Sequence, residues 1–152
     1  MTTRSRMHIL VAEDDPDDRE LVREAFAQCG ITDSLHFMQD GEEVTAFLAG
    51  RPPEHGNFPV PGLLLLDLNM PRKDGLEVLR ELRASAEHCN LPAIVLSTSS
   101  DPRDIAAAYR AGANSFITKP SSYDALVTIV RSLTEYWLTT VALPEKAGAH
   151  GC

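Results

Sequence analysis

The sequence predicts an α/β protein with a doubly wound parallel sheet, a (βα)5 three-layer sandwich with helices on both faces. Two observations carry this prediction. Short, continuous apolar runs recur along the chain, and stretches with helical periodicity and recognisable helix starts lie between them. Because right-handed crossovers join parallel strands, five strands favour the sheet order 2-1-3-4-5 over a larger sheet.

Four apolar runs are predicted to be central strands, because they are continuous rather than alternating, as in strands buried on both faces. They span residues 8–12, 63–66, 93–96 and 115–118. A fifth run, residues 35–39, alternates in polarity and is predicted to lie nearer the edge of the sheet.

The first helix is predicted to begin at Pro16, because Asp15 can cap it and proline suits the first helical position. Gly30 is predicted to end this helix. Asp15 is therefore expected to be a cap rather than a metal ligand. The apolar residues of this stretch share one helical face: Leu21, Val22, Ala25 and Phe26.

The later helices have similar starts. Aspartates precede the stretches that begin at Gly75 and Pro102, and Ser121 or Ser122 can cap the last helix. Residues 49–62 contain four of the ten prolines and are predicted to form a long loop before the third strand.

The length of 152 residues and the formal net charge of −8 fit one globular domain and disfavour nucleic acid as a partner, since nucleic-acid binders carry a basic face. No apolar run approaches the roughly 20 residues of a membrane helix, and the N-terminus lacks the apolar stretch of a signal peptide. We therefore expect a cytoplasmic protein without a membrane partner. Cys29, Cys89 and Cys152 lack paired spacing and are expected to be reduced thiols.

Each central strand ends in side chains that can carry chemistry. They are Glu13, Asp14 and Asp15 after the first, Asp67 after the second, Ser97 and Thr98 after the third, and Lys119 after the fourth. Because the carboxyl ends of parallel strands meet at one edge, we expect these groups to share one crevice. Clustered carboxylates repel one another, a divalent cation relieves that repulsion, and an all-oxygen ligand set favours Mg²⁺.

The other strand-end groups indicate phosphoryl chemistry. An ammonium such as Lys119 and a hydroxyl such as Ser97 are suited to holding phosphoryl oxygens beside a metal-bound carboxylate. Asp67 is placed to be the nucleophile.

These residues, in this order and context, resemble the receiver domains of two-component response regulators, which have the CheY-like, flavodoxin-like fold. The matching segments are ILVAEDD (9–15), LLLLDLNMPRKDG (63–75), Ser97-Thr98 and FITKP (116–120). The resemblance covers residues 7–138. It implies that the chain is not an enzyme in the ordinary sense but a signalling protein that accepts a phosphoryl group from a sensor histidine kinase.

The resemblance also assigns roles to individual residues. Asp67 matches the phosphoacceptor, and Lys119 matches the lysine that contacts the phosphate. Glu13 and Asp14 match the acidic pair that binds Mg²⁺, with Asp67 and the backbone carbonyl of Asn69 as further ligands.

Two switch positions follow from the same resemblance. The hydroxyl of Ser97 is expected to shift toward the phosphoryl group, beside the backbone of Thr98, and Phe116 is expected to become buried on phosphorylation. Phe116 stands where the family often has tyrosine, so a contact through a tyrosine hydroxyl is not available. Thr98 is bulkier than the residue usual at its position.

The apolar pattern from Ser122 runs unbroken to Pro144 and predicts a helix of about 22 residues, roughly 33 Å, which overhangs the sheet. We expect the overhang to be buried in a symmetric dimer; the alternative is that it folds back on its own domain. The predicted receiver domain is residues 7–143, between flexible termini 1–6 and 144–152. The expected dimer residues are Tyr136, Trp137, Leu138 and Val141.

No further domain is expected after Lys119, so the predicted output is protein association. The proline-rich loop and the Tyr136-Trp137-Leu138 motif resemble single-domain regulators that partner bacterial and cyanobacterial phytochrome histidine kinases. A histidine phosphotransfer protein is a further partner that the resemblance allows.

Two alternative functions remain open at this point. One is a phosphorylation-independent binding module with a vestigial site. The other is a Mg²⁺-dependent phosphatase of the haloacid dehalogenase type, which needs a second aspartate two residues after its nucleophile. Asn69 occupies that position and cannot donate a carboxyl proton.

Overall fold

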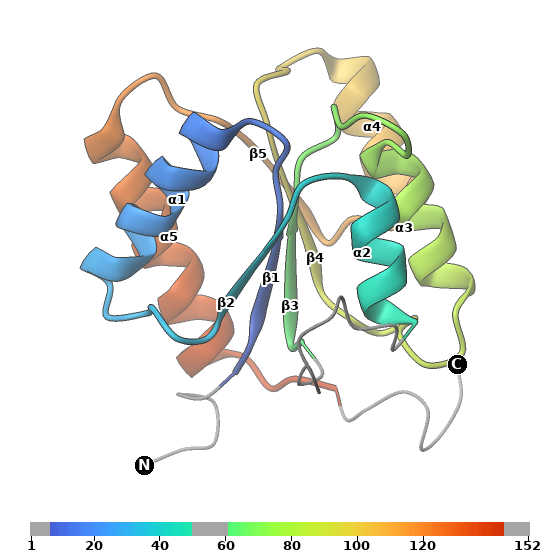
Figure 1. Ribbon diagram of the computed structural model, residues 1–152, viewed down its shortest axis with the longest axis horizontal. Coiled ribbons are helices and arrows are strands. Elements are labelled where there is room, and N and C mark those ends of the chain that lie inside the picture. Colours follow the sequence, from blue (N-terminus) through green and yellow to red (C-terminus); the bar gives the residue numbers. More distant parts are fainter. Residues whose placement is uncertain (1–6, 50–60, 145–152) are drawn as a thin grey trace.

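A computed structural model describes residues 7–49 and 61–144, and within them five parallel strands form one sheet between two layers of helices (Figure 1). The strands are β1 (Ile9–Ala12), β2 (Leu35–Met38), β3 (Leu63–Leu66), β4 (Ala93–Ser97) and β5 (Ser115–Thr118). Their order, β2-β1-β3-β4-β5, confirms the predicted one, and every neighbouring pair is parallel.

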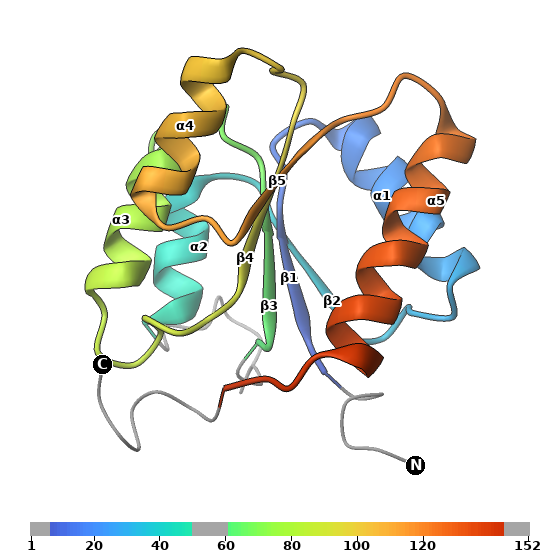
Figure 2. The same cartoon turned by 180° about the vertical axis from the view of Figure 1, so that it is seen from behind.

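The helices cover both faces of the sheet. They are α1 (Pro16–Gln28), α2 (Gly41–Leu48), α3 (Gly75–Ala84), α4 (Pro102–Ala111) and α5 (Tyr123–Glu135), followed by the π-helical turn η2 (Tyr136–Thr140). α1 and α5 lie on one face, and α2, α3 and α4 lie on the other (Figures 1 and 2). Among the described residues, no helix is both long enough and apolar enough to cross a membrane.

The two faces of the sheet have separate hydrophobic cores, and the central strand β3 contributes to both. Leu64 and Leu66 pack beneath α2, α3 and α4, whereas Leu63 and Leu65 pack beneath α1 and α5. None of the four leucines is more than 2% exposed. A strand buried on both faces has no polar side, which explains its continuous apolar run.

The predicted helix starts are confirmed at α1 and α4, and so is the predicted end of α1. Asp15 accepts hydrogen bonds from the backbone N–H groups of Asp17 and Asp18, at 2.8 and 3.3 Å, and so caps α1. Gly30 and Gly112 follow α1 and α4 with φ angles of 81° and 113°, which glycine adopts without strain.

Helix α2 was not identified from the sequence, although a capping signal precedes it. Asp40 Oδ1 accepts from the N–H of Glu43 at 2.9 Å, and Glu43 Oε2 accepts from the N–H of Gln39 at 3.1 Å. An acidic residue at the cap with glutamate three residues later is close to a capping box. The predicted loop after this helix lies mostly outside the described residues.

Gly75 begins α3 at a point where the chain passes close to the end of β3. A Cβ atom at this position would lie 2.6 Å from the carbonyl oxygen of Asp67. The N–H of Gly75 donates to the carbonyl of Leu68 at 2.9 Å. The absence of a side chain therefore allows the loop after Asp67 to close tightly.

The last helix is shorter than predicted. It ends at Thr140 rather than Pro144, because its final turn widens: the N–H of Val141 bonds to the carbonyl of Tyr136, five residues back, and Val141 itself is extended. Trp137 and Leu138 are half-buried against the core under α1 and α5, while Tyr136 remains 52% exposed. Two residues of the overhang therefore fold back in part on their own domain, which was the alternative to a dimer, and burial of the set in a dimer stays a prediction.

The cysteines differ from one another. Cys29 is a free thiol, as expected, but Cys89 is disulfide-bonded, so the expectation of a reduced thiol was wrong for Cys89. The predicted flexible segments 1–6 and 144–152 lie outside the described residues apart from Pro144, and the domain bounds 7–143 stay a prediction.

Candidate functional site

The sheet brings the predicted residues together at the edge where its strands end. Glu13 and Asp67 directly follow the adjacent strands β1 and β3, and the N–H of Asp67 bonds to the carbonyl of Ala12 at 3.0 Å. Ser97 ends β4 and Lys119 follows β5, with the N–H of Lys119 bonded to the carbonyl of Ser97 at 2.7 Å. Backbone pairing between neighbouring strands therefore fixes the positions of all four residues.

Three carboxylates form a candidate cation site. One carboxylate oxygen from each of Glu13, Asp14 and Asp67 lies within 4.8 Å of the other two. Glu13 and Asp67 are 3% and 8% exposed, whereas Asp14 is open to solvent. Burial is the main cause that raises the pKa of Glu13, to about 8, and neighbouring Asp67 also raises it while Lys119 opposes the shift. Buried oxygen ligands with one open side fit a partly hydrated hard cation.

The main chain beneath the acidic pair is held by a helix residue. One nitrogen of the Arg19 guanidinium, in α1, donates to the carbonyls of both Glu13 and Asp14 at 2.9 Å. This contact ties the turn between β1 and α1 to the helix and restricts the positions of both carboxylates.

Lys119 is the electrostatic centre of the site. Its ammonium contacts Glu13 Oε1 and lies 3.2 Å from Asp67 Oδ2. Burial lowers the pKa of Lys119, but the hydrogen bond to Glu13 and the charges of Asp67 and Glu13 outweigh that effect and raise it above its ordinary value. The side chain is therefore cationic at every physiological pH.

Asp18 is a member of this cluster that sequence reasoning missed. Its place in the first turn of α1 suggests only an interaction with the helix dipole, yet its Oδ2 lies 3.1 Å from Lys119 Nζ. Spacing could not reveal this contact, because it depends on how the first turn of α1 meets the end of β5. Asp15, by contrast, caps α1 as predicted.

The remaining predicted residues surround Asp67 in different ways. The N–H of Asn69 donates to Asp67 Oδ1 at 3.1 Å, and the proposed role of the Asn69 carbonyl as a metal ligand stays a prediction. Ser97 is fully buried, and its Oγ accepts from the N–H of Ser99 at 3.2 Å. Thr98 is exposed in the loop after β4.

Phe116 lies on β5, half-buried against the core beneath α4. Its N–H donates to the hydroxyl of Tyr109, a residue of α4 that is 48% exposed, at 3.2 Å. A tyrosine hydroxyl is thus present near the switch position, although it comes from the neighbouring helix. The predicted dimer residues lie elsewhere, beyond the end of α5.

A doubly wound five-stranded sheet with acids, a hydroxyl and a lysine at its carboxyl edge defines the receiver class, and the chain belongs to that family. The family described as "Response regulator receiver domain" matches residues 9–131. The protein therefore has the phosphoryl-accepting role of a receiver in a two-component system, whose partner is a sensor histidine kinase.

Three relatives are particularly similar. Response regulator Rcp1 of Synechocystis sp. is 38% identical over 136 residues, 90% of this chain and 92% of Rcp1. A Mn²⁺-bound crystal structure of Rcp1 gives a TM-score of 0.81 at 37% identity, covering 91% of this chain and 99% of that one. The phosphorylated cyanobacterial phytochrome response regulator RcpA gives 0.83 at 37% identity, with the same coverage. RPA3017, of red light signalling in R. palustris, gives 0.85 at 39% identity, covering 92% of this chain and 99% of that one.

Proposed function

We propose that Asp67 accepts a phosphoryl group from a phosphohistidine of a sensor histidine kinase. The observation that carries this assignment is the placement of the buried Asp67 carboxylate between the Lys119 ammonium, 3.2 Å away, and the carboxylates of Glu13 and Asp14. The cluster holds the nucleophile, a fixed cation and a candidate metal site within one small volume, as phosphoryl transfer requires.

In the proposed reaction, a carboxylate oxygen of Asp67 attacks the phosphorus atom, and the bond from phosphorus to the histidine nitrogen breaks. Lys119 then holds a phosphoryl oxygen in place of one of its present carboxylate partners. The hydroxyl of Ser97 turns from the N–H of Ser99 toward the phosphoryl group, and Phe116 moves further into the core beneath α4.

Glu13, Asp14 and Asp67 would hold a Mg²⁺ ion, with the backbone carbonyl of Asn69 as a further ligand. The donor set fits, because all the candidate ligands are oxygen atoms, and the raised pKa of Glu13 reflects a buried carboxyl that a cation would stabilise in its charged form. Bound there, Mg²⁺ would neutralise part of the charge on the phosphoryl oxygens.

The direct test incubates the purified protein with Mg²⁺ and acetyl phosphate and follows its intact mass. We expect the gain of one phosphoryl group, which is lost in Asp67→Asn and when EDTA is added. Asp15→Asn is the matched control, because Asp15 is two residues from Glu13 but caps α1, and asparagine also caps helices. A modified Asp67→Asn protein, or an unmodified wild type, would refute the assignment and leave a binding module.

We also propose that the partner kinase is a phytochrome. The support is the similarity to Rcp1, RcpA and RPA3017 over nine-tenths of the chain. A kinase that forms phosphohistidine from ATP works in the cytoplasm, where we place this protein.

Phosphotransfer from a purified phytochrome kinase should be at least tenfold faster than from an unrelated histidine kinase; equal rates would refute the pairing. The rate at which the phosphoryl group passes from Asp67 to a purified histidine phosphotransfer protein tests whether such a protein is a further partner.

The proposed output is a homodimer through the end of α5. Tyr136 is exposed and packs edge-on against Trp137 at 5.3 Å between ring centroids, and Val141 and Leu138 are only half-buried. An exposed aromatic beside partly covered apolar residues is typical of an interface. Sedimentation of the unmodified and phosphorylated protein tests whether the dimer forms and whether phosphorylation changes it.

A further inference from the structure

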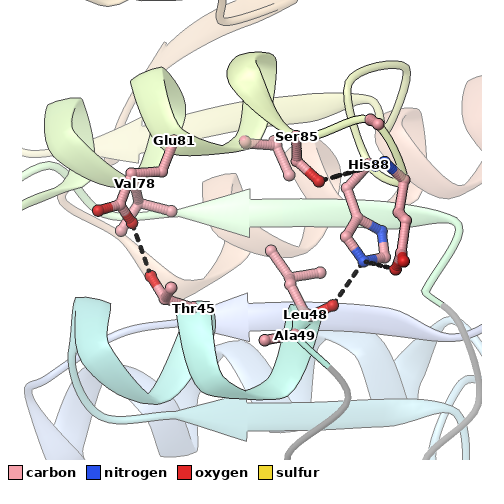
Figure 3. Close-up of a pocket in the computed structure, with 10 residues that line it drawn as sticks. Thr45, Leu48, Ala49, Val78, Glu81, Ser85 and His88 are labelled. Atoms are coloured by element: carbon pink, nitrogen blue, oxygen red, sulfur yellow. Dashed lines mark hydrogen bonds and ion pairs between the residues drawn. The ribbon is translucent and has the colours of Figure 1, made fainter. Parts of the chain in front are cut away.

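Two cavities differ in their relation to the phosphorylation site. A groove of about 410 Å³ lies between α2 and α3, where the hydroxyl of Thr45 donates to Glu81 at 3.1 Å (Figure 3). No residue of the metal and phosphoryl cluster lines this groove. A smaller cavity, of about 90 Å³, lies between α1 and α5 and is lined in part by Asp18 and Lys119. Lys119 therefore borders open space, and packing alone does not fix the position of its ammonium.

Hydrogen bonds hold the Lys119 ammonium instead. Its partners are Glu13, Asp67 and Asp18, and the Oδ2 atom of Asp18 lies 3.1 Å from Nζ. An ammonium has three N–H donors, so these three contacts use its whole capacity. The Lys119 side chain is only 13% exposed, and a change in any one partner therefore affects a group that is largely shielded from water.

Asp18 differs from the other two partners because it is not part of the candidate cation site. The carboxylates that form that site belong to Glu13, Asp14 and Asp67. A cation that binds there draws on the negative charge of Glu13 and Asp67, which the Lys119 ammonium would otherwise share. It leaves the contact between Asp18 and Lys119 in place.

The Asp18 carboxylate stands on a rigid part of the chain. The N–H of Asp18 donates to the capping carboxylate of Asp15 at 3.3 Å. The guanidinium of Arg19, the next residue, donates to the carbonyls of Glu13 and Asp14 at 2.9 Å. The first turn of α1 is thus fixed to the turn that carries the acidic pair, and a side chain on a fixed helix start is placed more precisely than one on a loop.

We propose that Asp18 is a positioning residue for phosphoryl transfer, whose carboxylate holds the Lys119 ammonium beside Asp67 when a cation engages Glu13 and Asp67 and the phosphoryl donor approaches. This role rests on the proposed function of Asp67. Without Asp18, the ammonium can turn into the cavity between α1 and α5. The transferring group then meets a fixed cation for only part of the time.

The role is tested by the rate of phosphorylation at saturating Mg²⁺, with acetyl phosphate as the donor. Asp18→Ala should lower this rate about tenfold and leave the dissociation constant of Mg²⁺ within about threefold of the wild-type value. Asp18→Asn keeps an oxygen that accepts from the ammonium, and its rate should return to within about threefold of wild type. Time courses of intact mass give the rates, and calorimetric titration gives the Mg²⁺ affinity.

Asp17→Ala is the matched control. Asp17 is an exposed aspartate in the same turn of α1, so its removal makes the same change in net charge and in the interaction with the helix dipole. Its rate should equal that of the wild type. Thermal unfolding checks that all the variants fold.

A double-mutant cycle with Lys119→Met distinguishes positioning from a direct effect of the Asp18 charge. In the Lys119→Met background, Asp18→Ala should change the rate by less than about twofold, because the side chain that Asp18 positions is absent. An equal loss in both backgrounds would show that Asp18 acts on the transferring group itself and would overturn the proposal.

Three other results would also overturn it. One is an equal rate in Asp18→Ala and Asp17→Ala, and another is a loss of Mg²⁺ affinity large enough to account for the slower reaction. The third is faster phosphorylation of Asp18→Ala, which would show that Asp18 mainly competes with the phosphoryl group for Lys119. Failure of the proposed function would appear differently, as a wild type that gains no phosphoryl group, and Asp18 would then have no transfer to assist.

Discussion

Lys119 contacts three acidic side chains on three different elements, since Glu13 follows β1, Asp18 lies on α1 and Asp67 follows β3. A phosphoryl group competes with these side chains for one ammonium. Phosphorylation should therefore weaken the contacts of Lys119 with the end of β1 and with α1, as well as its contact with Asp67.

We expect Lys119→Met to lower the rate of phosphorylation by acetyl phosphate about a hundredfold, because a fixed cation beside the transferring group is lost. Lys73→Met is the matched control, since Lys73 is also a mostly buried lysine in an ion pair, with Glu81. The measurement is the time course of intact mass. Equal rates in the two variants would contradict the role of Lys119.

The raised pKa of Glu13 predicts how Mg²⁺ binding depends on pH. The folded protein keeps the Glu13 proton up to about pH 8, whereas the unfolded chain loses it near the ordinary value of 4.5. The free protein therefore loses stability as pH rises between these values, and Mg²⁺, which needs the carboxylate, binds more tightly. Calorimetry should show affinity rising by up to about tenfold per pH unit below pH 8. A flat profile in the wild type, or an unchanged slope in Glu13→Gln, would contradict this.

At the scale of elements, the wide final turn of α5 and η2 gives two adjacent aromatics different surroundings. Trp137 packs on the core beneath α1 and α5, and Tyr136 faces solvent. Trp137→Ala should lower the free energy of unfolding by about 1–2 kcal/mol, from lost apolar burial. Tyr136→Ala should change it by less than about 0.5 kcal/mol but weaken the proposed dimer about tenfold. Denaturant unfolding and sedimentation separate the two effects, and a destabilised Tyr136→Ala would contradict the assignment.

Arg83 joins its own helix, α3, to the loops that precede β4 and β5. Its guanidinium donates to the carbonyls of Gly112, Cys89 and Leu91 and to Asn114 Oδ1, at 2.7–2.9 Å. Arg83→Met should therefore lower the free energy of unfolding by about 2–4 kcal/mol, because half-buried carbonyls lose their donors. Arg80→Met, on an exposed position of the same helix, should cost less than about 0.5 kcal/mol. Similar values for both would show that the Arg83 contacts do not stabilise the fold.

At the scale of the whole molecule, one sheet carries two cores, so we expect both to unfold together. Leu64→Ala and Leu65→Ala remove equal side chains from opposite faces of β3, and each should cost about 3–4 kcal/mol. Far-UV circular dichroism and Trp137 fluorescence should report one shared transition in each variant. Separate transitions would show that the two faces unfold independently.

The sequence predicted the features that depend on residues close together in the chain, and those that follow from the topology of a parallel sheet. The apolar runs predicted the central strands because both faces of the sheet are buried, and the strand-end rule placed Glu13, Asp67, Ser97 and Lys119 at one edge. The contact between Asp18 and Lys119 and the packing of Trp137 depend on distances between elements, which periodicity does not contain. The disulfide at Cys89 belongs to the same class, because the spacing of the cysteines did not predict it.

The tight passage at Gly75 has a genetic consequence. Every single-nucleotide change in a glycine codon that does not preserve glycine or stop translation adds at least a Cβ atom, which would press on the main chain of Asp67 from 2.6 Å. In a library of random substitutions this position should therefore tolerate almost nothing. A map of mutational sensitivity should show Gly75 to be as intolerant of substitution as the residues of the phosphorylation site. Gly75 takes no part in the chemistry and only leaves space for the main chain of Asp67.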